Sequence, residues 1–139
     1  MVVQKNDKFI LVKIFKESID EFDINNKENV INLFKEIFLK LKKKYNLSGL
    51  FDVDVFVNPE YGMILEIVPV YEYLEEIDMR IKIHLDCVFL DLIDSSEILD
   101  YEIVYYYKDK FYGVYNGKGE HNVLYHECCE IIDKGIRVY

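Results

Sequence analysis

The densest group of potential metal ligands in this chain lies between His121 and Glu130, in the sequence HNVLYHECCE. Imidazole and thiolate groups are the usual ligands of zinc. On a helix, His121 and Cys128 fall on one side, whereas His126 and Cys129 fall on another. Structural zinc sites usually contain paired cysteines at short regular spacings, and this stretch has none. We therefore expect no cofactor and no metal, but the sequence leaves metal binding open for His121, His126, Cys128 and Cys129.

A second candidate group centres on His84, in the stretch Met79–Phe89, where apolar and polar residues alternate. As a strand, this stretch places four polar residues on one face: Arg80, Lys82, His84 and Asp86. A neighbouring strand that carries Asp52 and Asp54 would lie beside them, and a histidine next to carboxylates can act as a general base. The same pattern is typical of a solvated sheet face with cross-strand ion pairs, which we favour. The enzymatic alternative is a metal-dependent hydrolase that uses His84, Asp86, His121 and His126.

Other catalytic motifs are missing from the sequence. No serine lies in a Gly-x-Ser-x-Gly elbow, and the three cysteines form no Cys-x-x-Cys pair. No Walker loop and no Gly-x-Gly-x-x-Gly motif occurs. We therefore expect a protein that is not an enzyme.

Acidic residues are concentrated between Tyr71 and Glu102, where ten carboxylates face only two basic residues. This stretch carries almost the whole net charge of −9. Since the sign of the charge influences the choice of partner, the acidic stretch favours a basic partner. Tyrosines concentrate just after it, and outward-facing tyrosines suit a protein surface better than a phosphate backbone.

These observations predict a small, non-enzymatic interaction protein that occludes a basic protein partner, such as a nuclease or another nucleic-acid-binding protein. Anti-defence inhibitors of phages and mobile elements act in this way. The expected partner-binding residues are Glu72, Glu75, Glu76, Asp78, Asp94, Glu97, Asp100, Tyr105 and Tyr107. The lysines between Lys40 and Lys44 complement the negative end of a helix dipole, so we expect no direct binding of nucleic acid. The main alternative is a housekeeping cytosolic adaptor or regulator, with a possible homodimer.

The elements that must position these residues are predicted from periodicity. Strands are expected at Phe9–Phe15, Asp52–Val57, Met63–Val70, Met79–Phe89, Glu102–Tyr107, Lys110–Tyr115 and Ile136–Tyr139. Helices are expected at Glu28–Tyr45, capped by Asn25 or Asn26, and at Glu120–Asp133, with a short helical piece at Ser95–Leu99. The predicted fold is α+β (β-α-β-β-β-β-β-α-β), a mostly antiparallel sheet with two helices packed on one face.

Length and composition complete the expectation. The 139 residues, of which 51% are hydrophobic, predict a single globular domain over residues 1–139. Three cysteines, two of them adjacent, make a poor disulfide framework and favour a cytoplasmic protein. We expect no signal peptide and, because no apolar run is long enough, no membrane span, so no membrane partner is expected. Abundant Ile, Lys, Asn, Tyr and Phe indicate a low-GC bacterium or one of its phages.

Overall fold

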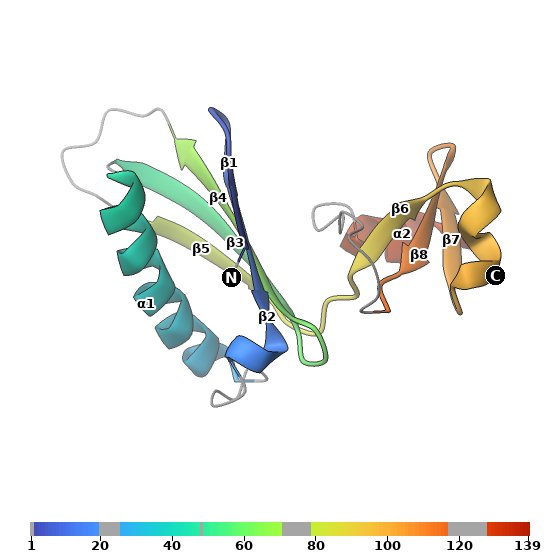
Figure 1. Ribbon diagram of the computed structural model, residues 1–139, viewed down its shortest axis with the longest axis horizontal. Coiled ribbons are helices and arrows are strands. Elements are labelled where there is room, and N and C mark those ends of the chain that lie inside the picture. The colour runs from blue at the N-terminus through green and yellow to red at the C-terminus, as the bar shows by residue number, and fades with distance from the viewer. Residues whose placement is uncertain (1, 20–25, 48, 71–78, 117–127) are drawn as a thin grey trace. The chain divides into compact units, whose positions relative to one another are not determined.

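The computed structural model describes residues 2–19, 26–47, 49–70, 79–116 and 128–139, without the side chains of Val2, Cys128 and Cys129. The chain divides into two compact units, Met1–Asp86 and Cys87–Tyr139 (Figure 1). We call them unit 1 and unit 2 and describe each by itself. The single domain expected from the length stays a prediction.

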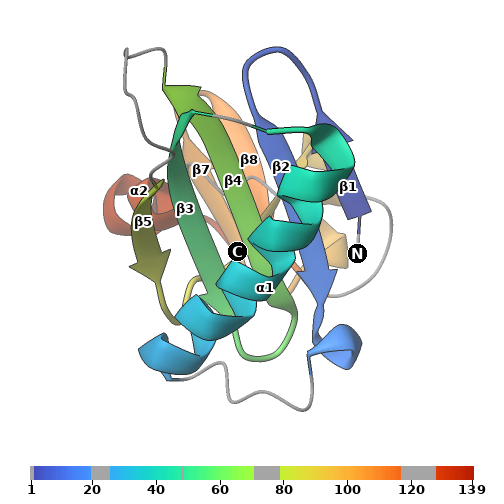
Figure 2. The same ribbon diagram turned by 90° about the vertical axis from the view of Figure 1, so that its left-hand side faces the viewer.

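Unit 1 is a five-stranded sheet covered on one face by a long helix (Figure 2). Its elements are β1 (Val2–Lys5), β2 (Ile10–Phe15), the short 3-10 helix η1 (Lys16–Ser18), α1 (Lys27–Tyr45), β3 (Leu50–Asn58), β4 (Gly62–Val70) and β5 (Met79–His84). The strand order is β1-β2-β4-β3-β5. Neighbouring strands are antiparallel except for β3 and β5, which run parallel.

Helix α1 forms where the sequence predicts it. The Asn26 side chain accepts a hydrogen bond from the backbone N–H of Glu28 at 2.9 Å, which caps the first turn. The helix ends at Asn46, whose left-handed conformation closes the last turn. Its buried stripe comprises Val30, Leu33, Phe34, Ile37, Phe38 and Leu41. This stripe forms one continuous core with alternate apolar residues of the sheet, so it fixes which sheet face is left for polar side chains.

A tight turn between β3 and β4 sets the register of these two strands. Asn58 Oδ1 accepts hydrogen bonds from the backbone N–H groups of Glu60 and Tyr61, and Gly62 follows with φ of 120°. A Cβ atom on Gly62 would lie 2.1 Å from the carbonyl oxygen of Ile14, so only glycine fits there. The predicted β3–β4 hairpin is thus confirmed. The β1–β2 hairpin was not predicted, because Val2–Lys5 is short and polar in part.

Unit 2 is a four-stranded antiparallel sheet with the strand order β6-β8-β7-β9. Its elements are β6 (Leu90–Ile93), the 3-10 helix η2 (Ser95–Asp100), β7 (Val104–Tyr107), β8 (Lys110–Val114), α2 (Cys128–Lys134) and β9 (Ile136–Arg137). A small apolar cluster lies on each face of this sheet. Ile131 of α2 packs with Leu90 and Tyr112 on one face. On the other face, Ile98 of η2 packs against a cluster of Ile93, Tyr101 and Val104.

The predicted α+β class with mostly antiparallel strands and two helices is confirmed. The prediction of one sheet with both helices on one face is wrong, because the strands form two sheets and each carries one helix. The long strand predicted over Met79–Phe89 is also wrong. The chain turns at Leu85–Asp86, where Asp86 has φ of 55°, and the next strand belongs to the second sheet. No helix within the described ranges is long and apolar enough to cross a membrane.

Candidate functional site

The structure brings together three of the predicted partner-binding acids. Asp94 precedes η2, and Glu97 and Asp100 lie within it. The other four predicted acids, Glu72, Glu75, Glu76 and Asp78, lie outside the described residues.

The sequence DSSE folds locally as a capped turn. Asp94 Oδ1 accepts a hydrogen bond from the backbone N–H of Ser96 at 2.9 Å, and the Ser96 hydroxyl donates to the same oxygen. The Glu97 carboxylate in turn accepts from the backbone N–H of Asp94, which completes a capping box. The hydrogen bonds from Ser96 lower the pKa of Asp94, so this carboxylate stays ionised well below neutral pH. The turn therefore holds its negative charge in a fixed position.

The geometry of a 3-10 helix arranges η2 into rows, because residues three apart lie above one another. Asp94, Glu97 and Asp100 have this spacing and form an acidic row. Ile98 faces the small core, whereas its neighbour Leu99 points outward with 80% of its surface exposed. We call Asp94, Glu97, Leu99 and Asp100 the η2 surface. It combines an exposed apolar side chain with carboxylates.

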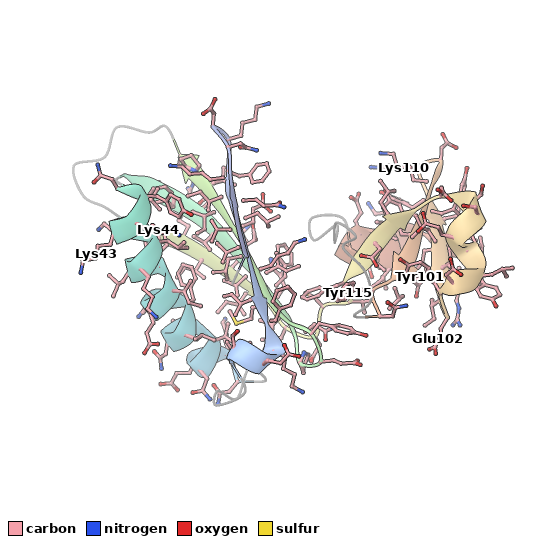
Figure 3. All side chains as sticks on the ribbon, viewed as in Figure 1. Lys43, Lys44, Tyr101, Glu102, Lys110 and Tyr115 are labelled. Atoms are coloured by element: carbon pink, nitrogen blue, oxygen red, sulfur yellow. The ribbon has the colours of Figure 1, made fainter. Side chains whose placement is uncertain are left out.

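A shallow concavity of about 490 Å³ adjoins the η2 surface. Apolar and charged side chains both line it: Leu92, Asp94, Glu97, Asp109, Lys110 and Phe111. Leu92 is 45% exposed. Figure 3 shows Glu102 pointing outward from unit 2 and Tyr101 inside it. The acidic row thus borders a partly apolar hollow, which suits the apolar stem and charged head of a basic side chain.

The two predicted tyrosine anchors lie on the opposite sheet face. Tyr105 and Tyr107 pack, half-buried, against the cluster that contains Ile131 of α2. A hydrogen bond from Tyr107 lowers the pKa of the Glu130 carboxylate, and the Lys108 ammonium lies 4.9 Å from the Tyr107 ring centroid. These tyrosines therefore do not share one continuous surface with the acidic row.

Not every acid of the stretch between Tyr71 and Glu102 is on the surface. Asp91 is fully buried, and its Oδ2 accepts a hydrogen bond from the Tyr101 hydroxyl at 3.2 Å. Burial, followed by the charge of Asp91, raises the pKa of Tyr101. The ring of Tyr101 covers Gly113, where a Cβ atom would lie 2.5 Å from the ring. This hydrogen bond joins β6 to the residue that follows η2, and Asp91 adds no charge to the surface.

The polar residues expected around His84 lie on the side of the first sheet opposite α1, where Phe56 and Ile64 are buried on the same face. Arg80 donates two hydrogen bonds to Asp52, Nε to Oδ1 at 2.5 Å and Nη2 to Oδ2 at 2.9 Å. His84 Nε2 lies 2.9 Å from Asp54 Oδ1, and its ring stacks on Phe56 with 4.7 Å between the ring centroids. The parallel register of β3 and β5 places Arg80 directly opposite Asp52, and it places His84 diagonally across from Asp54. The prediction that Asp52 and Asp54 lie beside the polar face of the Met79 strand is thereby confirmed.

One buried carboxylate joins this face. Glu66 lies directly opposite Asp54 across β3 and β4 and is 4% exposed. The pKa of Glu66 is raised to about 7. Burial is the larger cause, and the charge of Asp54 is the smaller one. Sequence reasoning missed Glu66, although a lone acid in the apolar run MILEIV is a visible signal. It also missed Leu99, whose outward position follows from the three-residue period of η2.

Metal ligands do not gather in the described part of the chain. Among the residues that the structure describes, no group of three His, Cys, Asp or Glu side chains has a geometry that could hold an ion. His121 and His126 lie outside the described residues, as do the side chains of Cys128 and Cys129. The histidine and the aspartate of the hydrolase hypothesis in unit 1, His84 and Asp86, lie on β5 and in the turn after it.

Comparison of this chain with protein-family models, with curated proteins and with solved structures finds no match.

Proposed function

We propose that this protein is a non-enzymatic, cytoplasmic interaction protein that binds a basic protein surface through the η2 surface. The observation that carries the proposal is Leu99, which a capped turn holds 80% exposed beside the acidic row. An apolar centre with a charged rim is the usual anatomy of a protein interface. No Lys, Arg or His occurs between Leu85 and Tyr107, so no basic side chain of this segment offsets its negative charge.

The mechanism that follows is competitive occlusion. Carboxylates at fixed positions occupy the sites where a nucleic-acid-binding protein or nuclease holds phosphates. Attraction between opposite charges accelerates the encounter, and burial of Leu99 slows dissociation. The protein itself need not contact nucleic acid or a membrane. The inhibitors that phages and mobile elements direct against host defence would act in this manner.

The test uses isosteric neutral substitutions that keep the turn intact. Asp94→Asn, Glu97→Gln and Asp100→Asn together remove three charges but retain capping side chains. The matched control removes three exposed acids from unit 1 by Glu17→Gln, Glu28→Gln and Glu36→Gln. Both variants and the unaltered protein serve as bait in a lysate of a low-GC bacterium, with elution along a salt gradient.

We expect the unaltered protein and the control to retain the same basic protein, which moderate salt releases. The η2 variant loses it, and the purified partner loses its nucleic acid when the unaltered protein is added. Retention by the η2 variant at the same salt would instead favour the adaptor alternative, in which the acids serve only solubility.

A second candidate function rests on the neighbourhood of Asp54, His84 and Glu66. A carboxylic acid with a pKa near 7 can give and take a proton at neutral pH, and such groups are frequent in active sites. The test is a screen of ester and phosphoester hydrolysis with the unaltered protein and with Glu66→Gln. Turnover that disappears in the variant supports acid–base catalysis, and equal rates exclude Glu66 as the acid or base.

A further inference from the structure

The C-terminal end of α1 carries a basic pocket within this acidic chain. Lys5 from β1 and Lys44 from α1 place their ammonium groups 5.2 Å and 5.5 Å from the centroid of the Tyr45 ring. Lys42 and Lys43 lie in the same helical turn as Lys44, and Figure 3 labels Lys43 and Lys44. Lysines from two separate elements thus converge on one aromatic ring.

The helix dipole alone does not account for this convergence. The last turn of α1 is already closed by its own backbone, because the N–H groups of Asn46 and Leu47 both donate to the Lys42 carbonyl. The dipole favours cations on the helix itself, but Lys5 comes from β1. The Tyr45 ring attracts both ammonium groups through cation–π contacts, and an anionic ligand beside the ring would pair with their charges.

The ring lies beside a pocket of about 300 Å³ with an apolar floor. The residues of its wall and floor that matter here are Lys5, Ile10, Tyr45, Leu47, Phe51 and Pro69. Ile10 and Phe51 are buried, and Asp7 contributes one acidic group to the wall. We call this hollow the Tyr45 pocket. It fits a ligand that presents an apolar side chain together with negative charges.

We propose that the Tyr45 pocket binds the η2 surface of a second copy of this chain. Leu99 enters the apolar floor, and the acidic row of Asp94, Glu97 and Asp100 faces Lys5 and Lys44. The match rests on charge complementarity and on an exposed apolar side chain facing an apolar hollow of suitable size. The proposal shares the η2 surface with the proposed function, so self-association and partner binding compete for the same residues.

Because the two surfaces differ, the contact is heterologous, and copies joined through it form closed rings or open chains. We expect the weight-average mass to rise above that of the monomer as protein concentration increases at low salt. The mass falls back to that of the monomer as the Debye length shrinks from about 30 Å at 0.01 M salt to about 10 Å at 0.1 M.

The test is sedimentation velocity with two complementary variants. Leu99→Asp damages the η2 surface and leaves the pocket, whereas the double variant Lys5→Glu with Lys44→Glu does the reverse. Each variant alone is expected to stay monomeric, and an equimolar mixture is expected to form a dimer and nothing larger. Two control variants change similar residues elsewhere. Leu39→Asp alters an exposed leucine on α1, and the double variant Lys16→Glu with Lys35→Glu reverses the charge of two other exposed lysines.

A monomeric unaltered protein at high concentration and low salt would overturn the proposal, as would a mixture that stays monomeric. Control variants that lose association equally would also overturn it, because the effect would then be one of net charge. Circular dichroism confirms that each variant is folded. Lysate capture, the test of the proposed function, separates the two proposals. The double variant Lys5→Glu with Lys44→Glu should still retain the basic partner, because only self-association uses the Tyr45 pocket. Leu99→Asp should lose the basic partner, because both proposals use the η2 surface.

Discussion

The two units bury their apolar residues in different ways. Unit 1 has one continuous core between α1 and its sheet, whereas unit 2 has a small cluster on each face of its sheet. The smaller unit also carries most of the exposed large apolar side chains: Leu92, Leu99, Ile136, Val138 and Tyr139. The comparison teaches that unit 1 gathers its apolar residues in one core, whereas unit 2 divides them and leaves more of them on its surface.

The largest expected effect tests the core of unit 1. Phe34 is fully buried, and its ring centroid lies 5.6 Å from that of Phe38. We expect Phe34→Ala to lower the free energy of unfolding by about 3–5 kcal/mol. Urea denaturation measures it, with the exposed Leu39→Ala as control. Ile131→Ala in unit 2 should lower the free energy of unfolding by less, because its cluster is smaller. A larger loss for Ile131→Ala than for Phe34→Ala would contradict the comparison.

The next prediction concerns Glu66, a buried carboxylate on the face of the first sheet opposite α1. The pKa of Glu66 is about 7 in the folded protein and near 4.5 in a solvated glutamate. The folded state therefore binds the proton more tightly, and stability falls as pH rises from about 4.5 through about 7. The loss approaches about 3 kcal/mol in the unaltered protein. Glu66→Gln should remove this part of the pH dependence.

Urea denaturation at two pH values, one on each side of this window, measures the difference. The exposed Glu36→Gln on α1 is the matched control and should leave the pH dependence as it is. If Glu66→Gln changed stability by the same amount at both pH values, its ionisation would not be linked to folding.

A third substitution tests how tightly unit 2 is packed despite its small clusters. Alanine at Gly113 would put Cβ against the Tyr101 ring, so either the ring or the strand must shift. We expect a loss of about 1–3 kcal/mol, which thermal unfolding measures. Lys110→Ala, at an exposed site on the same strand, should have little effect. An unchanged melting temperature in Gly113→Ala would mean that this side of unit 2 is loosely packed.

The smallest effect concerns the polar face of unit 1. The Arg80 side chain is 57% exposed, so its two hydrogen bonds to Asp52 compete with water. Arg80→Ala is expected to cost less than about 1 kcal/mol. A double-mutant cycle with Asp52→Asn isolates the pair. A coupling well above this value would show that unit 1 depends on its polar face as well as on its core.

Periodicity predicted most elements of the fold because the relevant signals are local. Asn26, the α1 stripe and the Asn58–Gly62 turn each lie within a short window of sequence. The break after His84 was missed because the apolar alternation continues through Leu85 and Cys87, although Asp86 adopts a left-handed conformation. The division into two sheets depends on which distant strands pair, and alternation alone does not specify that.

The candidate site was predictable only in part, for a similar reason. The acidic row was chosen by charge, and its three-residue spacing on η2 explains why those acids lie together. Charge could not show that Asp91 is buried or that Tyr105 and Tyr107 face α2. The Tyr45 pocket joins Lys5 to Lys44, residues that are far apart in the sequence and that only the folded sheet brings together.

The position of β5 at one end of the strand order has a consequence for solubility. An outermost strand offers unpaired backbone groups to other chains, and charged side chains on such a strand discourage that pairing. Arg80 and Lys82 alternate along β5 with apolar residues that face the core. Charges at these two positions therefore disfavour the pairing of β5 with a strand of another chain, an effect separate from what the Arg80–Asp52 pair adds to the free energy of unfolding.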